Sequence, residues 1–480
     1  MAERELSGSG QRLCVKGVIH VAILGAFAVP HPPLILPEIG RGEEKGIQAT
    51  IDAYREAARR AAALKPDVLI VLSPHSVMYR DYFHISPGQQ ARGSFAAFGR
   101  PDAACAVSYD GALAEAIESE AAASGIPAGK KGERRAELDH GTMIPLRFFC
   151  QSCGAIPVVR IGLSGLPLLE HYNFGKAIAR AAERLGRRAV VVASGDLSHK
   201  LKADGPYGFA PEGPEFDRRI MEIFSSADFG AMLELDPVFC EKAAECGLRS
   251  FVVMAGAFDG CDVESEVLSY EGPFGVGYGV ACFVPCAVDE RRRFDQLFLR
   301  REREKLRQTA ACEDAYVKLA RLSLEHYVKS GRVAELPDGL PEDLTKRRAG
   351  VFVSVKIAGE LRGCIGTIEP VRGSVAEEIL HNAVSAGTRD PRFAPVTEAE
   401  LPRLVYDVDV LSPAEEATKD DLDVRRYGVI VSSGHRKGLL LPDLEGVDTV
   451  ERQLDIALRK AGIERGENYS LQRFEVVRHR

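Results

Sequence analysis

The chain has 480 residues, of which 45% are hydrophobic and 27% are charged, and its formal net charge is −7. This mildly acidic balance gives no electrostatic footprint for nucleic acid or for an anionic membrane surface, so we expect a small-molecule ligand. The 11 cysteines form an odd set without framework spacing, which indicates a reducing compartment.

The first predicted element is a buried strand that ends beside a histidine. Residues 1–16 are mostly polar and are predicted to be a disordered tail. The apolar run at residues 18–29 is too short to cross a bilayer and lacks the cleavage site of a signal peptide, so it predicts a strand. Pro30 ends this strand and His31 follows it. Since no other long apolar run follows, we expect a cytoplasmic protein.

The same arrangement recurs twice further along the chain. Apolar runs lead to His75 at residues 68–75 and to His199 at residues 189–199. The Ala-rich and Arg-rich segment 47–64 has helical spacing, which makes a strand–helix–strand unit with parallel strands. Because ligands bind outside the carboxyl ends of such strands, the three histidines are predicted to share one crevice.

The remaining pattern predicts two domains. Alternating strands and helices to about residue 285 predict an α/β domain at residues 17–286, with a central, largely parallel sheet flanked by helices. Residues 287–308 are mostly charged and predict a helical linker. Residues 309–480 mix alternating strands with helices, which predicts a smaller α+β domain.

Two histidines and one carboxylate form a triad that binds non-haem Fe(II). His31 and His75 are placed to supply the imidazoles. The carboxylate could come from Glu241 or Glu245, which stand four residues apart on one helical face, and their spacing does not choose between them.

Two further histidines have acidic neighbours. His140 follows Asp139 at a predicted helix start, where an anionic ligand would be favoured. Asp196 precedes His199 by three residues and could orient its imidazole. With a pKa that can work near neutrality, His199 is our candidate for proton transfer.

Five motifs in order resemble one known family: A-V-P-H-P-P, S-P-H-S, D-H-G-T-M-I-P-L, G-D-L-S-H and E-C-G-L-R-S-F-V-V-M-A-G-A. Over about residues 19–285 the chain resembles the LigB-type class III extradiol ring-cleavage dioxygenases and their Memo-like relatives. The resemblance implies a mononuclear Fe(II) site with His31, His75 and Glu245 as ligands. It also implies His199 as the acid/base, assisted by His140.

The third ligand has an alternative, because Memo-like proteins have a cysteine at the position of Cys246. We prefer Glu245, since a carboxylate suits Fe(II). The implied reaction opens the ring of a catechol-like aromatic substrate beside its two hydroxyls, using O2. Zinc is a possible substitute metal, and a zinc hydrolase with the same ligands is a weaker alternative.

The second domain carries two further motifs. L-R-G-C-I-G contains Cys364, a possible nucleophile for which His381 is a conceivable base. This motif and S-A-G-T-R-D-P-R-F-A-P-V resemble the AMMECR domain, over about residues 309–480. The two domains together resemble the AmmeMemoRadiSam system, which implies a radical SAM partner. A metal-binding or scaffolding component without oxygenase activity is therefore the alternative function.

Overall fold

The computed structural model describes residues 21–134, 137–444, 446–464 and 466–480. The predicted tail, residues 1–16, lies outside the described residues. Contacts divide the chain into two compact units, Met1–Leu299 and Arg300–Arg480, which we call the N-terminal and C-terminal units. The division falls within helix α9 (Phe294–Cys312), inside the segment expected to be a charged linker.

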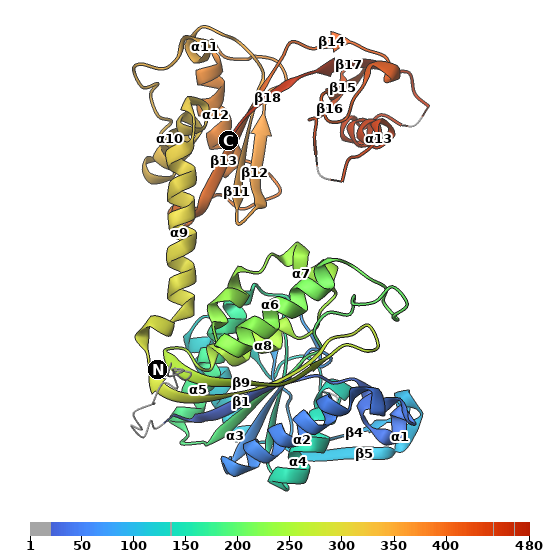
Figure 1. Ribbon diagram of the computed structural model, residues 1–480. Helices are drawn as coiled ribbons and strands as arrows, with labels where there is room; N and C mark the ends of the chain where they lie inside the picture. Colours follow the sequence, from blue (N-terminus) through green and yellow to red (C-terminus); the bar gives the residue numbers. More distant parts are fainter. Residues whose placement is uncertain (1–20, 135–136, 445, 465) are drawn as a thin grey trace, which may run out of the picture. The chain divides into compact units, whose positions relative to one another are not determined.

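A mixed sheet forms the centre of the N-terminal unit (Figure 1). Its strand order is β7-β2-β8-β1-β10-β9, in which β7, β2, β8 and β1 run parallel and β10 and β9 are antiparallel to their neighbours. The strands are β1 (Ile23–Val29), β2 (Val68–Ser73), β7 (Val158–Gly162), β8 (Ala189–Ser194), β9 (Cys261–Glu271) and β10 (Tyr278–Val288).

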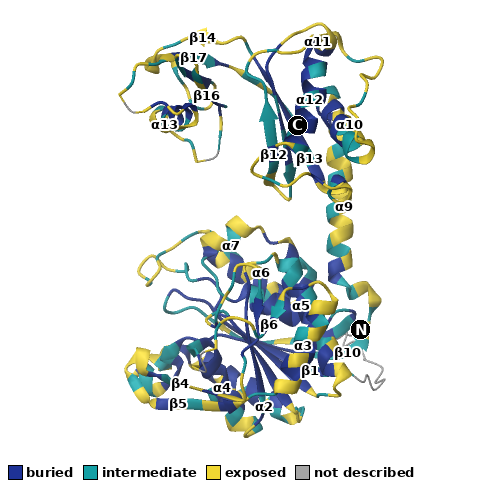
Figure 2. Ribbon diagram, turned by 180° about the vertical axis from the view of Figure 1, so that it is seen from behind, coloured by how far each residue is buried: buried dark blue, intermediate teal, exposed yellow. Residues whose placement is uncertain are grey.

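Helices cover both faces of this sheet, so alternate side chains of each central strand enter separate cores. Phe27 and Val71 pack on the face with α2 and α4, whereas Ala28 and Ile70 pack on the face with α3, α5, α6 and α8. This double burial explains why β2 and β8 are buried at every position. The central part of the sheet is correspondingly dark blue in Figure 2. The helices are α1 (Pro37–Gly40), α2 (Gln48–Ala63), α3 (Gly111–Ala123), α4 (His140–Cys153), α5 (Leu168–Arg184), α6 (Glu212–Ser226), α7 (Pro237–Ala243) and α8 (Leu248–Gly256).

Two small strand pairs lie outside the central sheet. They are β3 (Phe83–His84) with β6 (Ala128–Gly129), and β4 (Gln90–Phe95) with β5 (Arg100–Ser108). A short 3-10 helix, Ala96–Phe98, joins β4 to β5.

The C-terminal unit contains two antiparallel sheets and several helices. One sheet has the order β12-β11-β13-β18 and the other β14-β17-β15-β16. The helices are α10 (Ala315–Ser330), α11 (Glu342–Thr345), α12 (Val375–Thr388) and α13 (Val450–Ala461). The strands are β11 (Val351–Ile357), β12 (Glu360–Gly366), β13 (Leu404–Leu411), β14 (Glu415–Glu416), β15 (Gly428–Ser433), β16 (Arg436–Leu440), β17 (Ser470–Phe474) and β18 (Val476–His479). The predicted fold class, α/β followed by a smaller α+β domain, is confirmed.

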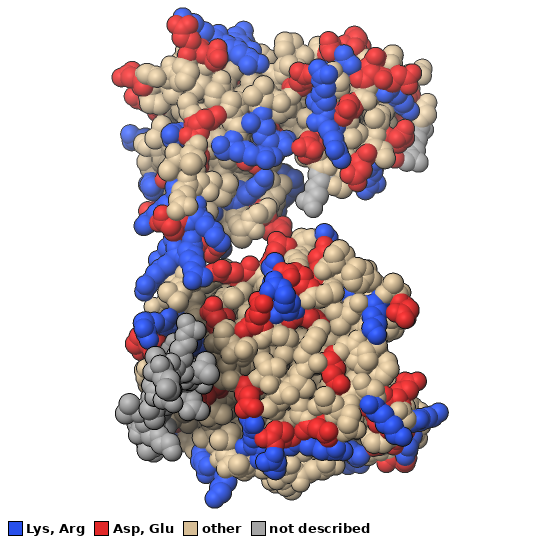
Figure 3. Space-filling model, viewed as in Figure 1, with Lys and Arg blue, Asp and Glu red and all other residues tan. Residues whose placement is uncertain are grey.

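Acidic and basic side chains are interspersed on the face of the molecule shown in Figure 3. In the part of the chain that the structure describes, none of the helices combines the length and apolar character that crossing a bilayer requires.

Candidate metal centre

The histidines that follow the first two buried strands meet at one edge of the central sheet. His31 lies two residues after β1, and His75 lies two residues after β2. Because β1, β8 and β2 run parallel, their carboxyl ends share that edge. The Nε2 atoms of His31 and His75 are 2.9 Å apart, and their ring centroids are 4.7 Å apart. The strand endings therefore bring two distant imidazoles together.

Contacts on the far side of the ring fix the orientation of His31. Its Nδ1 is hydrogen-bonded with Ser194 Oγ over 2.8 Å, and its backbone N–H donates to Asp196 Oδ1 over 2.7 Å. Because Nδ1 is engaged, Nε2 faces His75 and is the nitrogen available to a metal. Burial, reinforced by His75, lowers the pKa of His31 well below its usual value. The imidazole is thus neutral at neutral pH, as a metal ligand must be.

The third donor beside these histidines is Cys246 rather than the expected Glu245. Cys246 Sγ lies 3.6 Å from His31 Nε2, and the donor atoms of His31, His75 and Cys246 all lie within 4.8 Å of one another. Glu245 Oε2 instead accepts a hydrogen bond from the Leu248 N–H over 2.7 Å, at the start of α8. Adjacent side chains leave the backbone in different directions, so Cys246 faces the histidines while Glu245 caps the helix.

The other carboxylate considered, Glu241, is also outside this cluster. It is exposed on α7, and Ala244, with a φ of 53°, breaks the chain direction before Glu245 is reached. The helical face that Glu241 and Glu245 were expected to share therefore does not exist.

A close approach of two backbones places Cys246 beside the end of β8. A Cβ atom on Gly195 would lie 2.1 Å from the Cα of Gly247, so the chain after β8 can lie against the start of α8 only with glycine here. The Asp196 N–H, next in the chain, donates to Cys246 Sγ over 3.3 Å. Asp196, the acidic residue of the G-D-L-S-H motif, therefore lies at the site.

Asp196 and His199 form a second cluster with the same cysteine. Donor atoms of Asp196, His199 and Cys246 lie within 4.8 Å of one another. Burial raises the pKa of Asp196 to about 6. The His199 ring stacks on Tyr207 with centroids 5.1 Å apart, and its buried Nε2 has no hydrogen-bond partner among the described residues.

The donors of the first cluster fit a first-row metal ion. Metal bonds of about 2.0 Å to nitrogen and about 2.3 Å to sulfur let two such donors lie up to about 4.3 Å apart, and the separations of 2.9 and 3.6 Å are shorter. Burial, with help from Asp196, raises the pKa of Cys246 well above its usual value. A bound cation would be needed to hold this sulfur as a thiolate.

His140 is held next to the cluster by a helix cap. Asp139 is the N-cap of α4, and its carboxylate accepts hydrogen bonds from the Thr142 N–H over 2.9 Å and from Ser73 Oγ over 2.6 Å. The His140 ring, first in the helix, lies 4.1 Å from that of His75 between centroids. Burial, with the nearby His75, lowers the pKa of His140 to about 4.

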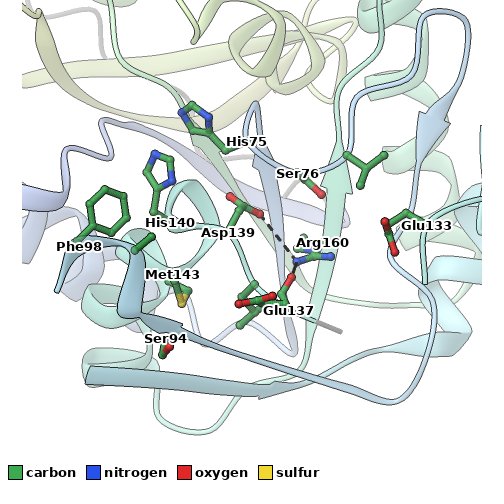
Figure 4. Close-up of a pocket in the computed structure, with 13 residues that line it drawn as sticks. His75, Ser76, Ser94, Phe98, Glu133, Glu137, Asp139, His140, Met143 and Arg160 are labelled. Atoms are coloured by element: carbon green, nitrogen blue, oxygen red, sulfur yellow. Dashed lines mark hydrogen bonds and ion pairs between the residues drawn. The ribbon is translucent and has the colours of Figure 1, made fainter. Parts of the chain in front are cut away.

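A cavity of about 350 Å³ opens beside His75 and His140 (Figure 4). Phe98 and Met143 supply apolar wall, and the Phe98 ring meets His140 edge-on with centroids 5.4 Å apart. Arg160 lies on the opposite wall and donates to the Glu137 carbonyl oxygen over 2.7 Å. The cavity has the size and mixed lining of a small-molecule site.

In the C-terminal unit the two motifs of the sequence meet, but the expected Cys364–His381 pair is not found. The Cys364 thiol accepts a hydrogen bond from Ser354 Oγ over 3.2 Å, and its backbone N–H donates to Asp390 Oδ2 over 2.9 Å. Among the described residues, the polar and ionisable side chains that act on the thiol include Ser354, Arg392, Asp409, Asp390 and Lys460, and burial raises its pKa. His381 is thus no base for Cys364 in this structure.

Comparison with known proteins bears on both units. The family model described as the catalytic LigB subunit of aromatic ring-opening dioxygenase matches residues 25–281, and the AMMECR1 model matches residues 317–479. The chain belongs to the LigB family and is fused to an AMMECR1 domain. We call residues 25–281 the LigB domain.

One relative matches this chain over nearly its full length, and others match about a third of it. A protein of Clostridium acetobutylicum is 40% identical over 468 residues, which cover 96% of this chain and 100% of the relative. A protein of Thermotoga maritima is 52% identical over 171 residues, covering 35% of this chain and 98% of the relative. A crystal structure of an uncharacterized protein from Pyrococcus horikoshii, 32% identical, covers 34% of this chain and 88% of its own, with a TM-score of 0.33.

The site of the LigB domain is only partly visible in the sequence. Strand-end histidines and the G-D-L-S-H motif pointed to His31, His75 and His199, and the pair Glu245-Cys246 was recognised as two alternatives. The cavity residues Phe98 and Arg160 carry no signal in the sequence, because they come from the short 3-10 helix between β4 and β5 and from the buried strand β7.

Proposed function

We propose that the LigB domain is a non-haem iron oxidoreductase that opens the ring of a catechol-like small molecule with O2. The observation that carries this proposal is the His31–His75 pair, with Nε2 atoms 2.9 Å apart, beside a cavity in a domain of the LigB family. Cys246 completes the donor set. When bound, Fe(II) would supply the Lewis acidity and redox capacity that ring opening requires.

The protein's own groups would orient the substrate. An aromatic ring in the cavity would lie against Phe98 and Met143, with the rings of His75 and His140 at one end. Arg160 would supply a polar contact at the other end. Its Nη1 and Nε are used by the Glu137 carbonyl and Ser86 Oγ, which hold the guanidinium in place.

Two imidazoles would handle the protons of the catechol hydroxyls. Burial lowers the pKa of both His140 and His199, so both are neutral near pH 7 and can accept a proton. His199 lies beside Asp196, whose carboxylate favours the charged imidazole and so supports its protonation. Both oxygen atoms of O2 enter the ring-opened product, so the reaction needs no external reductant.

The test is oxygen uptake by protein loaded anaerobically with Fe(II), across a panel of catechols. A yellow ring-opened product should form, and His199→Ala should lower the rate by at least about a hundredfold, as expected on loss of an acid–base group. His435→Ala removes an exposed imidazole of the C-terminal unit and is the matched control. One equivalent of bound Fe(II) per chain without oxygen uptake on any catechol would refute the proposal.

One observation favours a second function. A thiol stands where a carboxylate was expected, and thiolate ligands favour zinc and copper as well as iron. The LigB domain would then be a metal-binding component that serves a radical SAM partner. Metal binding without turnover, together with capture of a purified radical SAM protein that is lost in His31→Ala, would support this alternative.

A further inference from the structure

The donor atoms of the centre fall into two triplets that share one sulfur. The first is His31, His75 and Cys246, and the second is Asp196, His199 and Cys246. Within each triplet all donor atoms lie within 4.8 Å of one another, whereas no group among the described residues joins all five. One ion therefore cannot be surrounded by the whole set as it stands.

We propose that the centre has a second cation position, built from Asp196 and His199 and joined to the first through the Cys246 sulfur. Its ligand would be a divalent first-row cation such as Zn(II) or Co(II), for which imidazole, thiolate and carboxylate are all suitable donors. A thiolate shared by two cations would offset part of their positive charge, which the two neutral imidazoles of the first position cannot do.

The unused nitrogen of His199 supports this position independently of the spacing. His199 Nε2 is buried and has no hydrogen-bond partner among the described residues. Buried polar atoms are almost always paired, so an orphaned nitrogen on a residue that already belongs to the Asp196–His199–Cys246 cluster indicates a missing partner. The rest of the residue is held in place, since its backbone N–H donates to the Ala243 carbonyl oxygen over 3.2 Å.

The Asp196 carboxylate supplies a second independent argument. It is only 7% exposed, and the basic side chain found within 4.0 Å of it in the described part of the chain is the His31 imidazole, which is neutral at neutral pH. A buried carboxylate needs a compensating charge. Among the described residues, no lysine or arginine within ion-pair distance provides one, and a cation at the second position would.

Filling this position would oppose the proposed ring opening, and this consequence rests on that proposed function. A cation on His199 occupies the lone pair that would otherwise accept a proton from the catechol. Activity should therefore rise as the first equivalent of metal binds and fall as the second binds. The second position would make the enzyme sensitive to excess divalent metal.

Metal counting tests the position without turnover. Full-length protein saturated anaerobically with Co(II) or Zn(II) should carry two ions per chain in native mass spectrometry, and His199→Ala and Asp196→Asn should each carry one. The Co(II) charge-transfer absorption of the thiolate should grow in two steps in the parent protein and in one step in these variants. His435→Ala is the control and should retain both ions.

One ion per chain in the saturated parent protein would overturn the second position, as would two ions in both His199→Ala and Asp196→Asn. Because the counts need no substrate, absence of ring opening leaves this test intact. A protein that can bind two ions but shows no catechol turnover with one equivalent of Fe(II) would refute the proposed function alone.

Discussion

Asp139 holds the two sides of the metal centre together, and replacing it with alanine should weaken both the fold and metal binding. Its carboxylate accepts hydrogen bonds from the Thr142 N–H, from Thr142 Oγ1 over 2.8 Å and from Ser73 Oγ. Ser73 ends β2, two residues before His75, and Thr142 lies two residues after His140. One side chain thus fixes the spacing of both imidazoles.

The expected loss of stability follows from these contacts. Loss of an N-cap costs about 1 kcal/mol, and loss of a hydrogen bond to a charged group costs about 1.5–3 kcal/mol. Asp139→Ala should therefore destabilise the N-terminal unit by roughly 2–4 kcal/mol. At about 2–4 °C per kcal/mol for a unit of this size, its melting temperature should fall by roughly 4–16 °C. Asp139→Asn keeps a side chain that can cap the helix, so this variant should lose less stability than Asp139→Ala.

A second helix cap separates the effect on the fold from the effect on the centre. Asp110 caps α3 by accepting from the Leu113 N–H over 3.0 Å, and it belongs to neither donor triplet. By calorimetry both alanine variants should melt lower, but only Asp139→Ala should lose metal affinity, by about 10–100-fold as for groups that support metal ligands. Parental metal affinity in Asp139→Ala would refute the argument that this cap positions the histidines.

Three further changes test neighbouring parts of the N-terminal unit. Cys246→Ser should lower metal content, whereas Glu245→Gln should leave it unchanged; the reverse result by elemental analysis would restore the carboxylate as the ligand. Gly141→Ala should also lower metal content, because its Cβ would lie 2.7 Å from Ser73 Oγ; parental metal content would show that the site can adjust. Burial raises the pKa of Asp217 to about 7, so the folded protein favours the protonated carboxyl. Its contribution to stability is complete below the unfolded pKa of about 3.9 and is lost as the pH rises through about 7. Asp217→Asn should therefore gain stability relative to the parent as pH rises, by at most about 4 kcal/mol, and parallel melting curves against pH would contradict this.

The sequence predicts where the metal centre lies better than it predicts which side chains are its ligands. Buried strands are continuous apolar runs, and the polar residues that follow each run within one or two positions lie at the sheet edge, which is why His31 and His75 could be located. The choice between Glu245 and Cys246 depends on the rotation of the chain just before α8. That rotation is set by Ala244 and by the contact of Gly247 with Gly195, which are long-range features without a local signal.

In the C-terminal unit, too, contacts between residues far apart in the chain could not be predicted from the sequence. The motifs around Cys364 and Asp390 were recognised separately, and the structure joins them through a backbone hydrogen bond that no spacing rule describes. His381 was considered as a base because it is a nearby histidine in the sequence. It lies on α12, whereas the Cys364 thiol of β12 is hydrogen-bonded to Ser354 of the adjacent strand β11. Closeness in the sequence therefore does not place His381 against the thiol.

Metal uptake by the centre should depend on pH through one proton. The pKa of His31 is lowered, so this imidazole binds no proton that a metal must displace near neutrality, whereas the pKa of Cys246 is raised and its thiol must lose a proton to become a ligand. Affinity for Zn(II) should then rise by up to about tenfold per pH unit between about pH 6 and 8. Calorimetric titration in buffers of different ionisation enthalpy should detect about one proton released with the first ion. Cys246→Ser should release none, and an affinity that does not change with pH in the parent protein would mean that the sulfur is not a ligand.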